Sequence, residues 1–298
     1  MTLTGGGHLT LAGGTGNDRL YESQGNSRLD NVNNIISGSG QIGAGTATYL
    51  TNEAAGVIDA TLAGGLVINL GGVQLINAGL LEATGSNLSV ANSVFNTGGI
   101  VANGGNVSIA GNVNGAGTDT ISGSSLLDIG SSVGGAAAQA VSFSTGSTGT
   151  FKIDNAQSFS GTLAGLATGR TLDLGNIAIG SAALTYTGSM TSGVLTVTDG
   201  TTVAKIKLNG NYTQANFHLA NDGAGHTDVT YSGTGMVAQP FDSVKTVTSL
   251  STARPSSQLS GMIQAMAGFG TPNAGAISGM TIANDTSAAH PLLAVAHG

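Results

Sequence analysis

The stretch LAGGTGNDRLYES, near the amino terminus, has the spacing of a calcium-binding turn. Turns of the pattern Gly-Gly-x-Gly-x-Asp-x-apolar offer carbonyl and carboxylate oxygens, the hard ligands that Ca²⁺ prefers. The flanking stretches LTGGGHLTL and SQGNSRLDN do not repeat the aspartate at that place. We therefore expect at most an isolated half-site, with calcium as the single cofactor candidate. The pattern is matched by Gly13, Gly14, Gly16, Asp18 and Leu20, and the metal-ligand candidates are Asp18, Gly14 and Gly16.

Two carboxylates at equivalent repeat positions are the next candidates for chemistry. Asp59 and Glu82 each lie between an apolar residue and an alanine, so they are predicted to stack on an outer face. Paired carboxylates perform acid–base cleavage of glycosidic bonds, or hold a cation. The corresponding residue of the third repeat is Val101. A solvated outer face is therefore the preferred interpretation of this pair, and we expect no enzyme.

The histidines and glycines do not form a recognisable catalytic or metal motif. No two histidines have the close spacing of a zinc site. His226 lies near Asp222 and Asp228, where a surface imidazole beside carboxylates is the ordinary interpretation. No Gly-Lys-Ser/Thr phosphate loop occurs despite the 50 glycines. The histidines are His8, His218, His226, His290 and His297.

Charge is scarce in this chain and its balance is acidic. Only 8% of the 298 residues are charged, and the formal net charge is −7. No lysine or arginine occurs between Arg28 and Lys152. Nucleic-acid binding requires clustered cations, so we expect no nucleic-acid partner. No run of about 18 apolar residues is present, so no membrane-spanning segment is expected either.

The elements that carry these residues are predicted from an internal repeat. The phrases LTNEAAGVIDAT, LINAGLLEAT and VFNTGGIVAN share one pattern of apolar residues, asparagine and glycine. Their glycines, Gly56, Gly79 and Gly98, are spaced 23 and 19 residues apart. Short strands repeated with Gly/Asn turns at this period predict an all-β fold, a β-solenoid resembling a parallel β-helix.

The repeated asparagines have two interpretations. In stacked coils, Asn52, Asn77 and Asn96 form a ladder in which each side chain bonds the one above. Alternatively, they are present because asparagine tolerates left-handed turn geometry.

The sequence pattern changes near residue 140, where the Asn/Gly repeat gives way to alternating strands. GVLTVTDGTTVAKIKL has two alternating runs joined by Asp199-Gly200, which predicts a hairpin with Lys205 and Lys207 facing solvent. A second hairpin is predicted around the turn NDGAGHTD. These strands either cap the solenoid or form a separate sandwich. The predicted organisation is solenoid over residues 1–139, a hairpin-rich continuation or cap over 140–235, and a low-complexity tail over 236–298.

The tail is expected to be largely disordered, with one short amphipathic helix. Helical spacing of apolar residues supports that helix, and they are Leu259, Met262, Ile263 and Met266.

Together, phrases such as LDNVNNIISGSGQIG, VANGGNVSIAGNVNGAGTDTISG and the hairpin segment resemble the repeat blocks of exported proteobacterial proteins. These are the haemagglutinin-like and autotransporter-passenger-like β-strand-repeat proteins, and the Asp18 turn resembles one nonapeptide of the RTX type. The resemblance covers roughly residues 1–232. It implies an extracellular or cell-surface location and a role in adhesion, biofilm or matrix. Glycans, host-cell surfaces or extracellular matrix are the implied partners.

The predicted function is a structural and adhesive module of a secreted or surface-displayed repeat protein. Two alternatives stay open at this point. The first is a β-helical carbohydrate-active enzyme, a lyase or hydrolase. The second is a calcium-binding module secreted by a type I system.

Overall fold

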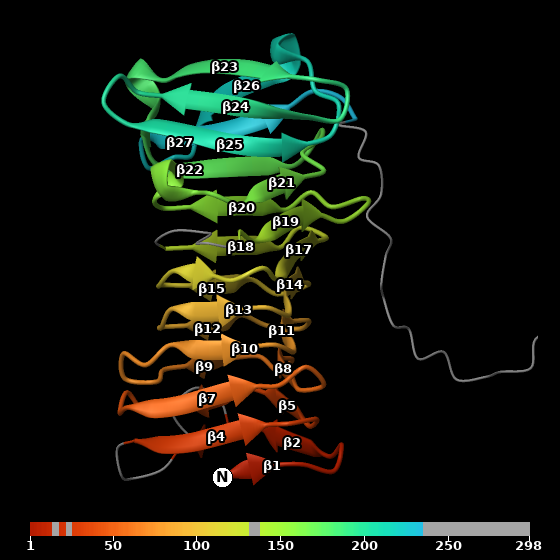
Figure 1. Ribbon diagram of the computed structural model, residues 1–298, viewed down its shortest axis with the longest axis vertical. Coiled ribbons are helices and arrows are strands. Elements are labelled where there is room, and N and C mark those ends of the chain that lie inside the picture. Colours follow the sequence, from red (N-terminus) through yellow and green to blue (C-terminus); the bar gives the residue numbers. More distant parts are fainter. Residues whose placement is uncertain (14–17, 22–25, 131–137, 235–298) are drawn as a thin grey trace, which may run out of the picture. The chain divides into compact units, whose positions relative to one another are not determined.

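The computed structural model describes residues 1–13, 18–21, 26–130 and 138–234, and these form an all-β solenoid (Figure 1). Three sheets run along the stack of coils: sheet A has six strands, sheet B eleven and sheet C ten. Sheet A consists of β1 (Thr2–Leu3), β4 (Ser27–Asn31), β7 (Thr48–Asn52), β10 (Leu75–Asn77), β13 (Val94–Asn96) and β16 (Val113–Asn114).

Sheets B and C contain the remaining strands, which follow in their spatial order. Sheet B consists of β2 (His8–Leu11), β5 (Ile35–Gly38), β8 (Val57–Ala60), β11 (Leu80–Ala83), β14 (Gly99–Asn103), β17 (Thr118–Ser122), β19 (Ala140–Phe143), β21 (Thr162–Ala164), β25 (Val203–Asn209), β24 (Ser192–Thr198) and β23 (Ala183–Gly188). Sheet C consists of β26 (Phe217–Asn221), β27 (His226–Tyr231), β22 (Thr171–Ala178), β20 (Thr150–Ile153), β18 (Leu126–Ile129), β15 (Val107–Ile109), β12 (Leu88–Val90), β9 (Leu66–Ile68), β6 (Gly40–Ile42) and β3 (Arg19–Leu20).

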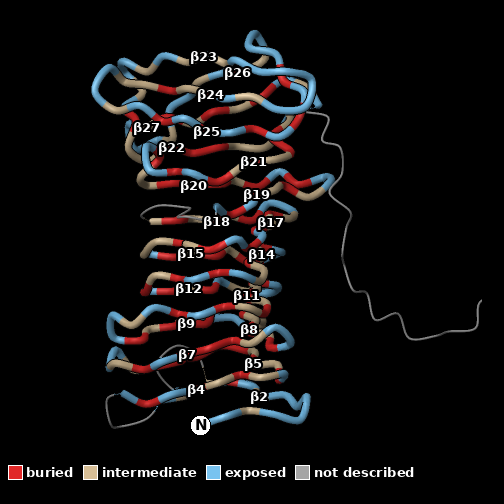
Figure 2. The backbone as a smooth tube through the Cα atoms, in the orientation of Figure 1, coloured by how far each residue is buried: buried red, intermediate tan, exposed pale blue. Residues whose placement is uncertain are grey.

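The core is built from apolar rows that run from coil to coil. Alternate residues of each strand face inward, and equivalent inward residues of successive coils stack in register. In sheet C, for example, Ile42, Ile68, Val90 and Ile109 form one fully buried row. Figure 2 shows buried positions alternating with exposed ones along the coils. This burial, at roughly 25 cal/mol per Å² of apolar surface, is the main stabilising contribution.

An asparagine ladder runs through the interior at the end of the sheet A strands. Asn31 donates from Nδ2 to Asn52 Oδ1 at 2.9 Å, and Asn52 donates to Asn77 Oδ1 at 2.9 Å. Asn77 then donates to Asn96 Oδ1 at 2.8 Å. All four side chains are fully buried. Among the described residues other than glycine, only Asn26 has a positive φ, so left-handed geometry does not explain the ladder residues. The predicted ladder is confirmed and includes Asn31.

Beside the ladder runs a column of glycines that lets the coils approach closely. The amide of Leu80 donates to Gly56 O at 3.0 Å, and the amide of Gly99 donates to Gly79 O at 2.8 Å. A Cβ on Gly79 or Gly98 would overlap backbone carbonyl oxygens of the coil before it. The repeated Asn–Gly phrase therefore encodes one corner of the coil, between sheet A and sheet B.

Parallel pairing continues past residue 139, the boundary predicted from the sequence. β17 pairs with β19, β19 with β21, and β20 with β22, all in parallel. What ends near this point is sheet A, whose last strand is β16. The Asn–Gly phrase disappears from the sequence because it belongs to the corner between sheets A and B. The change in the sequence pattern therefore marks the end of sheet A.

The predicted hairpins follow and extend the same two sheets. β24 and β25 are antiparallel around the Asp199–Thr202 turn, with Gly200 at φ +93°. Asp199 Oδ1 accepts from the amides of Thr201 and Thr202 at 2.9 and 2.7 Å, which fixes this turn. Lys205 and Lys207 are exposed as predicted.

The second hairpin, β26 and β27, joins sheet C through antiparallel pairing of β27 with β22. β25 pairs in parallel with β21 and so continues sheet B. The hairpins are therefore a cap continuous with the solenoid. An aromatic cluster packs within this cap, with neighbouring ring centroids 4.9 to 6.1 Å apart, and its members are Tyr186, Tyr212, Phe217 and Tyr231. Three short 3₁₀ turns complete the described fold: η1 (Ala156–Ser158), η2 (Ile179–Ser181) and η3 (Gln214–Asn216).

The predicted tail and its helix over Leu259–Met266 lie outside the described residues. Within the part of the chain that the structure describes, no helix is long and apolar enough to cross a membrane.

One core row contains a carboxyl group. Asp119 occupies the inward position of β17 that Ile100 occupies in β14 and Val141 in β19. It is fully buried, its Oδ1 accepts from Asn96 Nδ2 at 3.1 Å, and its Oδ2 has no hydrogen-bond partner. Burial raises the pKa of Asp119 to about 8, and the Asn96 bond only partly opposes this.

This carboxyl makes the stability of the solenoid depend on pH. The folded state keeps the Asp119 proton up to about pH 8, whereas the unfolded chain releases it near pH 4. The free energy of unfolding is therefore expected to fall as pH rises from about 4 to 8, by up to about 1.4 kcal/mol per pH unit. Urea unfolding of the wild type and of Asp119→Asn at pH 5, 6, 7 and 8 measures the slope. Equal slopes in both proteins would contradict this assignment.

Candidate functional site

The outer face of sheet A carries an unusual row of exposed apolar side chains. Tyr49, Ile76 and Phe95 are 49, 46 and 42% exposed. Ile76 of β10 and Phe95 of β13 are direct register partners on adjacent parallel strands. Tyr49 of β7 lies two residues before Thr51, which is the register partner of Ile76. The three side chains therefore form one patch across three successive coils, which we call the sheet A patch.

Polar groups surround the sheet A patch. Thr51 and Asn114 continue the Ile76–Phe95 row on either side; Thr51 is buried, and Asn114 is half-buried. Arg28 is the register partner of Tyr49. Its guanidinium lies 2.8 Å from Asp30 Oδ1, so its charge is balanced locally. The face therefore combines aromatic surface with the amide of Asn114 and the Arg28–Asp30 ion pair, and it has little net charge.

The strands present this face because of simple alternation. In LIN and VFN, the first and third residues are buried and the middle residue is exposed. The buried asparagines at the strand ends are locked by the ladder, which fixes the orientation of the residues beside them. The signal was present in the sequence as an apolar residue at an outward position of two successive repeats. The patch was not predicted because the middle residue of each triplet was not assigned to a face.

A small cavity lies close to this face. Its volume is about 80 Å³, and its lining includes Tyr21, Arg28 and Thr48. Ligand pockets that enclose a small molecule are typically about 300 to 1,000 Å³. Recognition by this part of the molecule would therefore use the surface of the sheet.

The structure brings together the predicted carboxylate pair. Asp59 of β8 and Glu82 of β11 are register partners, and Val101 takes that place in β14, as expected. Asp59 Oδ1 accepts from the backbone amide and the hydroxyl of Thr84 at 3.1 and 3.0 Å. Burial, and then the charge of Asp59, raise the pKa of Glu82. The Asp59 carboxylate thus stabilises the following corner of the coil.

The predicted calcium turn is only partly described, since Gly14 and Gly16 lie outside the described residues. Asp18 Oδ2 accepts from the backbone amides of Ala12 and Gly13 at 2.6 and 2.7 Å. This carboxylate oxygen is therefore bonded to two backbone amides of the same segment. Leu11, just before this turn, is buried.

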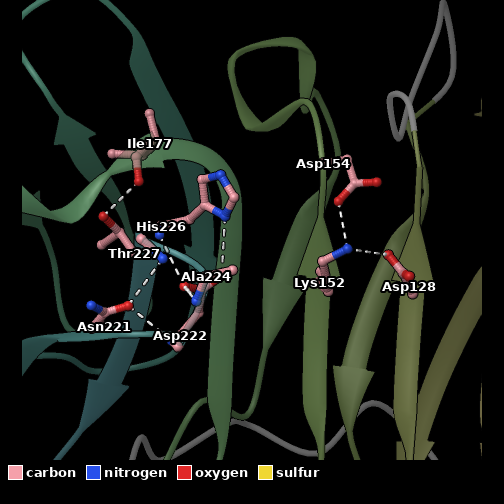
Figure 3. Close-up of polar contacts among 11 residues, drawn as sticks. Asp128, Lys152, Asp154, Ile177, Asn221, Asp222, Ala224, His226 and Thr227 are labelled. Carbon is pink, nitrogen blue, oxygen red and sulfur yellow. Dashed lines mark hydrogen bonds and ion pairs between the residues drawn. The ribbon is translucent and has the colours of Figure 1, made fainter.

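A group of charged residues lies on the outer face of sheet C near the cap (Figure 3). His226 Nδ1 lies 3.1 Å from Asp222 Oδ2, which matches the expected imidazole–carboxylate contact. Lys152 Nζ lies 3.3 Å from Asp128 Oδ1 and 2.6 Å from Asp154 Oδ1. Within the described parts of the chain, no group of three or more His, Cys, Asp or Glu side chains is placed so that it could hold a metal ion.

The fold defines this chain as a capped, parallel β-solenoid. A search of protein-family models returned no match to the chain, and neither did a search of curated proteins. The resemblance to exported β-strand-repeat proteins stays a prediction.

Proposed function

We propose that this chain is a structural and adhesive module of a secreted or cell-surface protein and that it binds neutral glycans through the sheet A patch. The observation that carries the proposal is the exposure of Tyr49, Ile76 and Phe95 on one face. Contiguous exposed apolar surface with a polar surround is typical of interaction sites. The C–H groups of a sugar ring pack against the electron-rich face of an aromatic ring. The neighbouring amide of Asn114 and the Arg28–Asp30 pair are suited to bonding sugar hydroxyls.

The charge of this face favours neutral over anionic glycans. Arg28 is the cation on the described strands of sheet A, and Asp30 neutralises it. A sulfated or uronic-acid polymer would find no unpaired cation on the described strands of this face, and it would also meet the net charge of −7 carried by the whole chain.

The internal structure supports a rigid binding face. Buried asparagines bond from coil to coil, and apolar rows fill the interior. Neighbouring strands lie about 4.8 Å apart, so the patch extends along successive coils. A preorganised face loses little conformational entropy when a ligand binds. A polymeric ligand lying along the stack would contact several coils at once. The extracellular location in this proposal rests on the resemblance of the repeat phrases.

An array of neutral and anionic glycans tests the proposal directly. The fluorescently labelled chain is expected to bind a subset of neutral oligosaccharides and to show no preference for sulfated or uronic-acid glycans. The physical reason is the uncharged aromatic patch. Binding that is confined to polyanions, or that is lost at 0.5 M NaCl, would contradict it. Absence of binding to every glycan on the array would equally contradict it.

A further inference from the structure

The acidic residues at the cap lie on one row across sheet C. Asp128 of β18 pairs with Lys152 of β20, Lys152 with Asp173 of β22, and Asp173 with Asp228 of β27. Asp222 reaches the same region, since its charge acts on both Asp173 and Asp228. Carboxylates therefore outnumber cationic groups in this part of the surface.

The two basic side chains near the row, Lys152 and His226, already have partners. Lys152 Nζ bridges Asp128 and Asp154, as Figure 3 shows. The His226 ring is held by Asp222 at 3.1 Å. Neither group forms an ion pair with Asp173 or Asp228 in the described structure.

Asp173 carries a buried carboxylate oxygen whose hydrogen-bonding capacity is not used. It is 9% exposed, and its Oδ1 is buried without a hydrogen-bond partner. A buried carboxylate oxygen without a partner is costly, because the water it loses is not replaced. Asp228 stands directly opposite across the antiparallel pair, where Cβ atoms are typically about 5 Å apart.

Electrostatics agree with this geometry. Burial, and then the charges of Asp228 and Asp222, raise the pKa of Asp173 to about 6. Burial and the charge of Asp222 also raise the pKa of Asp228. A cation between the two carboxylates would remove both the repulsion and the unsatisfied oxygen.

We propose that Asp173 and Asp228 form a binding site for a divalent cation, with Ca²⁺ as the ion whose preference for several hard oxygen ligands fits best. Water and nearby carboxylate or carbonyl oxygens would complete the coordination. Because only two carboxylates form the centre of the site, its affinity is expected to be in the range of about 0.1 to 1 mM, as in extracellular calcium modules. This site is separate from the Asp18 turn and independent of glycan binding at sheet A.

Isothermal titration of the full chain with CaCl₂ at pH 7.5 tests the proposal. The wild type and Asp18→Asn are expected to bind one Ca²⁺ with the same affinity, whereas Asp173→Asn and Asp228→Asn bind at least tenfold more weakly. In thermal unfolding, 5 mM CaCl₂ is expected to raise the Tm of the wild type and of Asp18→Asn, but not of Asp173→Asn.

A second readout separates a cation site from a site that holds only a proton. Without calcium, Asp173→Asn is expected to be more stable than the wild type at pH 7.5, because it removes an unpaired buried charge. If the wild type binds no Ca²⁺ and its stability responds only to pH near 6, a proton is the ligand and the proposal is wrong. Unchanged Ca²⁺ affinity in both Asp173→Asn and Asp228→Asn would also overturn it.

Discussion

Replacing Asn77 with alanine is expected to lower the free energy of unfolding by about 3 to 5 kcal/mol. Asn77 Nδ2 donates to Asn96 Oδ1 at 2.8 Å and to Gly99 O at 3.1 Å, and its Oδ1 accepts from Asn52 at 2.9 Å. The alanine would leave donors and acceptors of both neighbouring coils unsatisfied in a fully buried site. The measurement is urea unfolding followed by circular dichroism at pH 6.

The exposed Asn209 at the end of β25 supplies the matched control. Asn209→Ala is expected to change stability by less than about 0.5 kcal/mol, as surface substitutions usually do. If Asn77→Ala were as mild as Asn209→Ala, the ladder would not stabilise the solenoid. The same result would indicate that the coils are held by apolar rows alone.

The second large effect is expected for Gly98→Ala. A Cβ at this position would overlap the carbonyl oxygen of Gly79 and would lie 2.5 Å from that of Ala78. Both atoms belong to the backbone of the preceding coil, so relief requires the coils to separate. That separation would weaken the bond from the Gly99 amide to Gly79 O, now 2.8 Å. We expect a loss of at least about 4 kcal/mol, measured as a lower urea midpoint.

Gly180→Ala is the control for this substitution. Gly180 lies in η2, has no positive φ, and a Cβ there would meet no atom within 4 Å. We expect no loss of stability, since alanine restricts the unfolded chain more than glycine does. Soluble yield and β-sheet circular dichroism of Gly98→Ala are recorded first, because a chain that fails to fold supports the same conclusion. A Gly98→Ala protein with the midpoint of the wild type would contradict close coil approach at this column.

The solenoid could be predicted from the sequence because the asparagines and glycines at the corner between sheets A and B repeat from coil to coil. Two residue types recur at this corner: glycine where a carbonyl of the preceding coil approaches, and asparagine where a side chain must both donate and accept. Asn31 was missed because its phrase, LDNVNN, has Asn34 in the place that Gly56 takes in the next coil. The burial of Asp119 was not predicted, since an aspartate in a row of isoleucines and valines is not expected from pattern alone.

The candidate sites were harder to predict because they depend on register. Asp173 and Asp228 are 55 residues apart in the chain, and only the antiparallel pairing of β22 with β27 brings them together. The exposure of Ile76 and Phe95 follows from the alternation of buried and exposed residues along each strand. That the two side chains are neighbours depends on the stacking of coils. Asp18 satisfied the calcium pattern locally, and its Oδ2 accepts from the backbone amides of Ala12 and Gly13.

Glycan binding by the sheet A patch is tested most directly by equilibrium binding of the strongest neutral glycan from the array. The Tyr49→Ala/Phe95→Ala double variant is expected to bind at least about tenfold more weakly than the wild type, since each ring contributes about 1 kcal/mol. Its urea midpoint should be close to that of the wild type, because both side chains are exposed. Val203→Ala, which truncates an exposed apolar residue of sheet B, should bind like the wild type. Equal glycan affinity of the double variant and the wild type would contradict the proposed binding face.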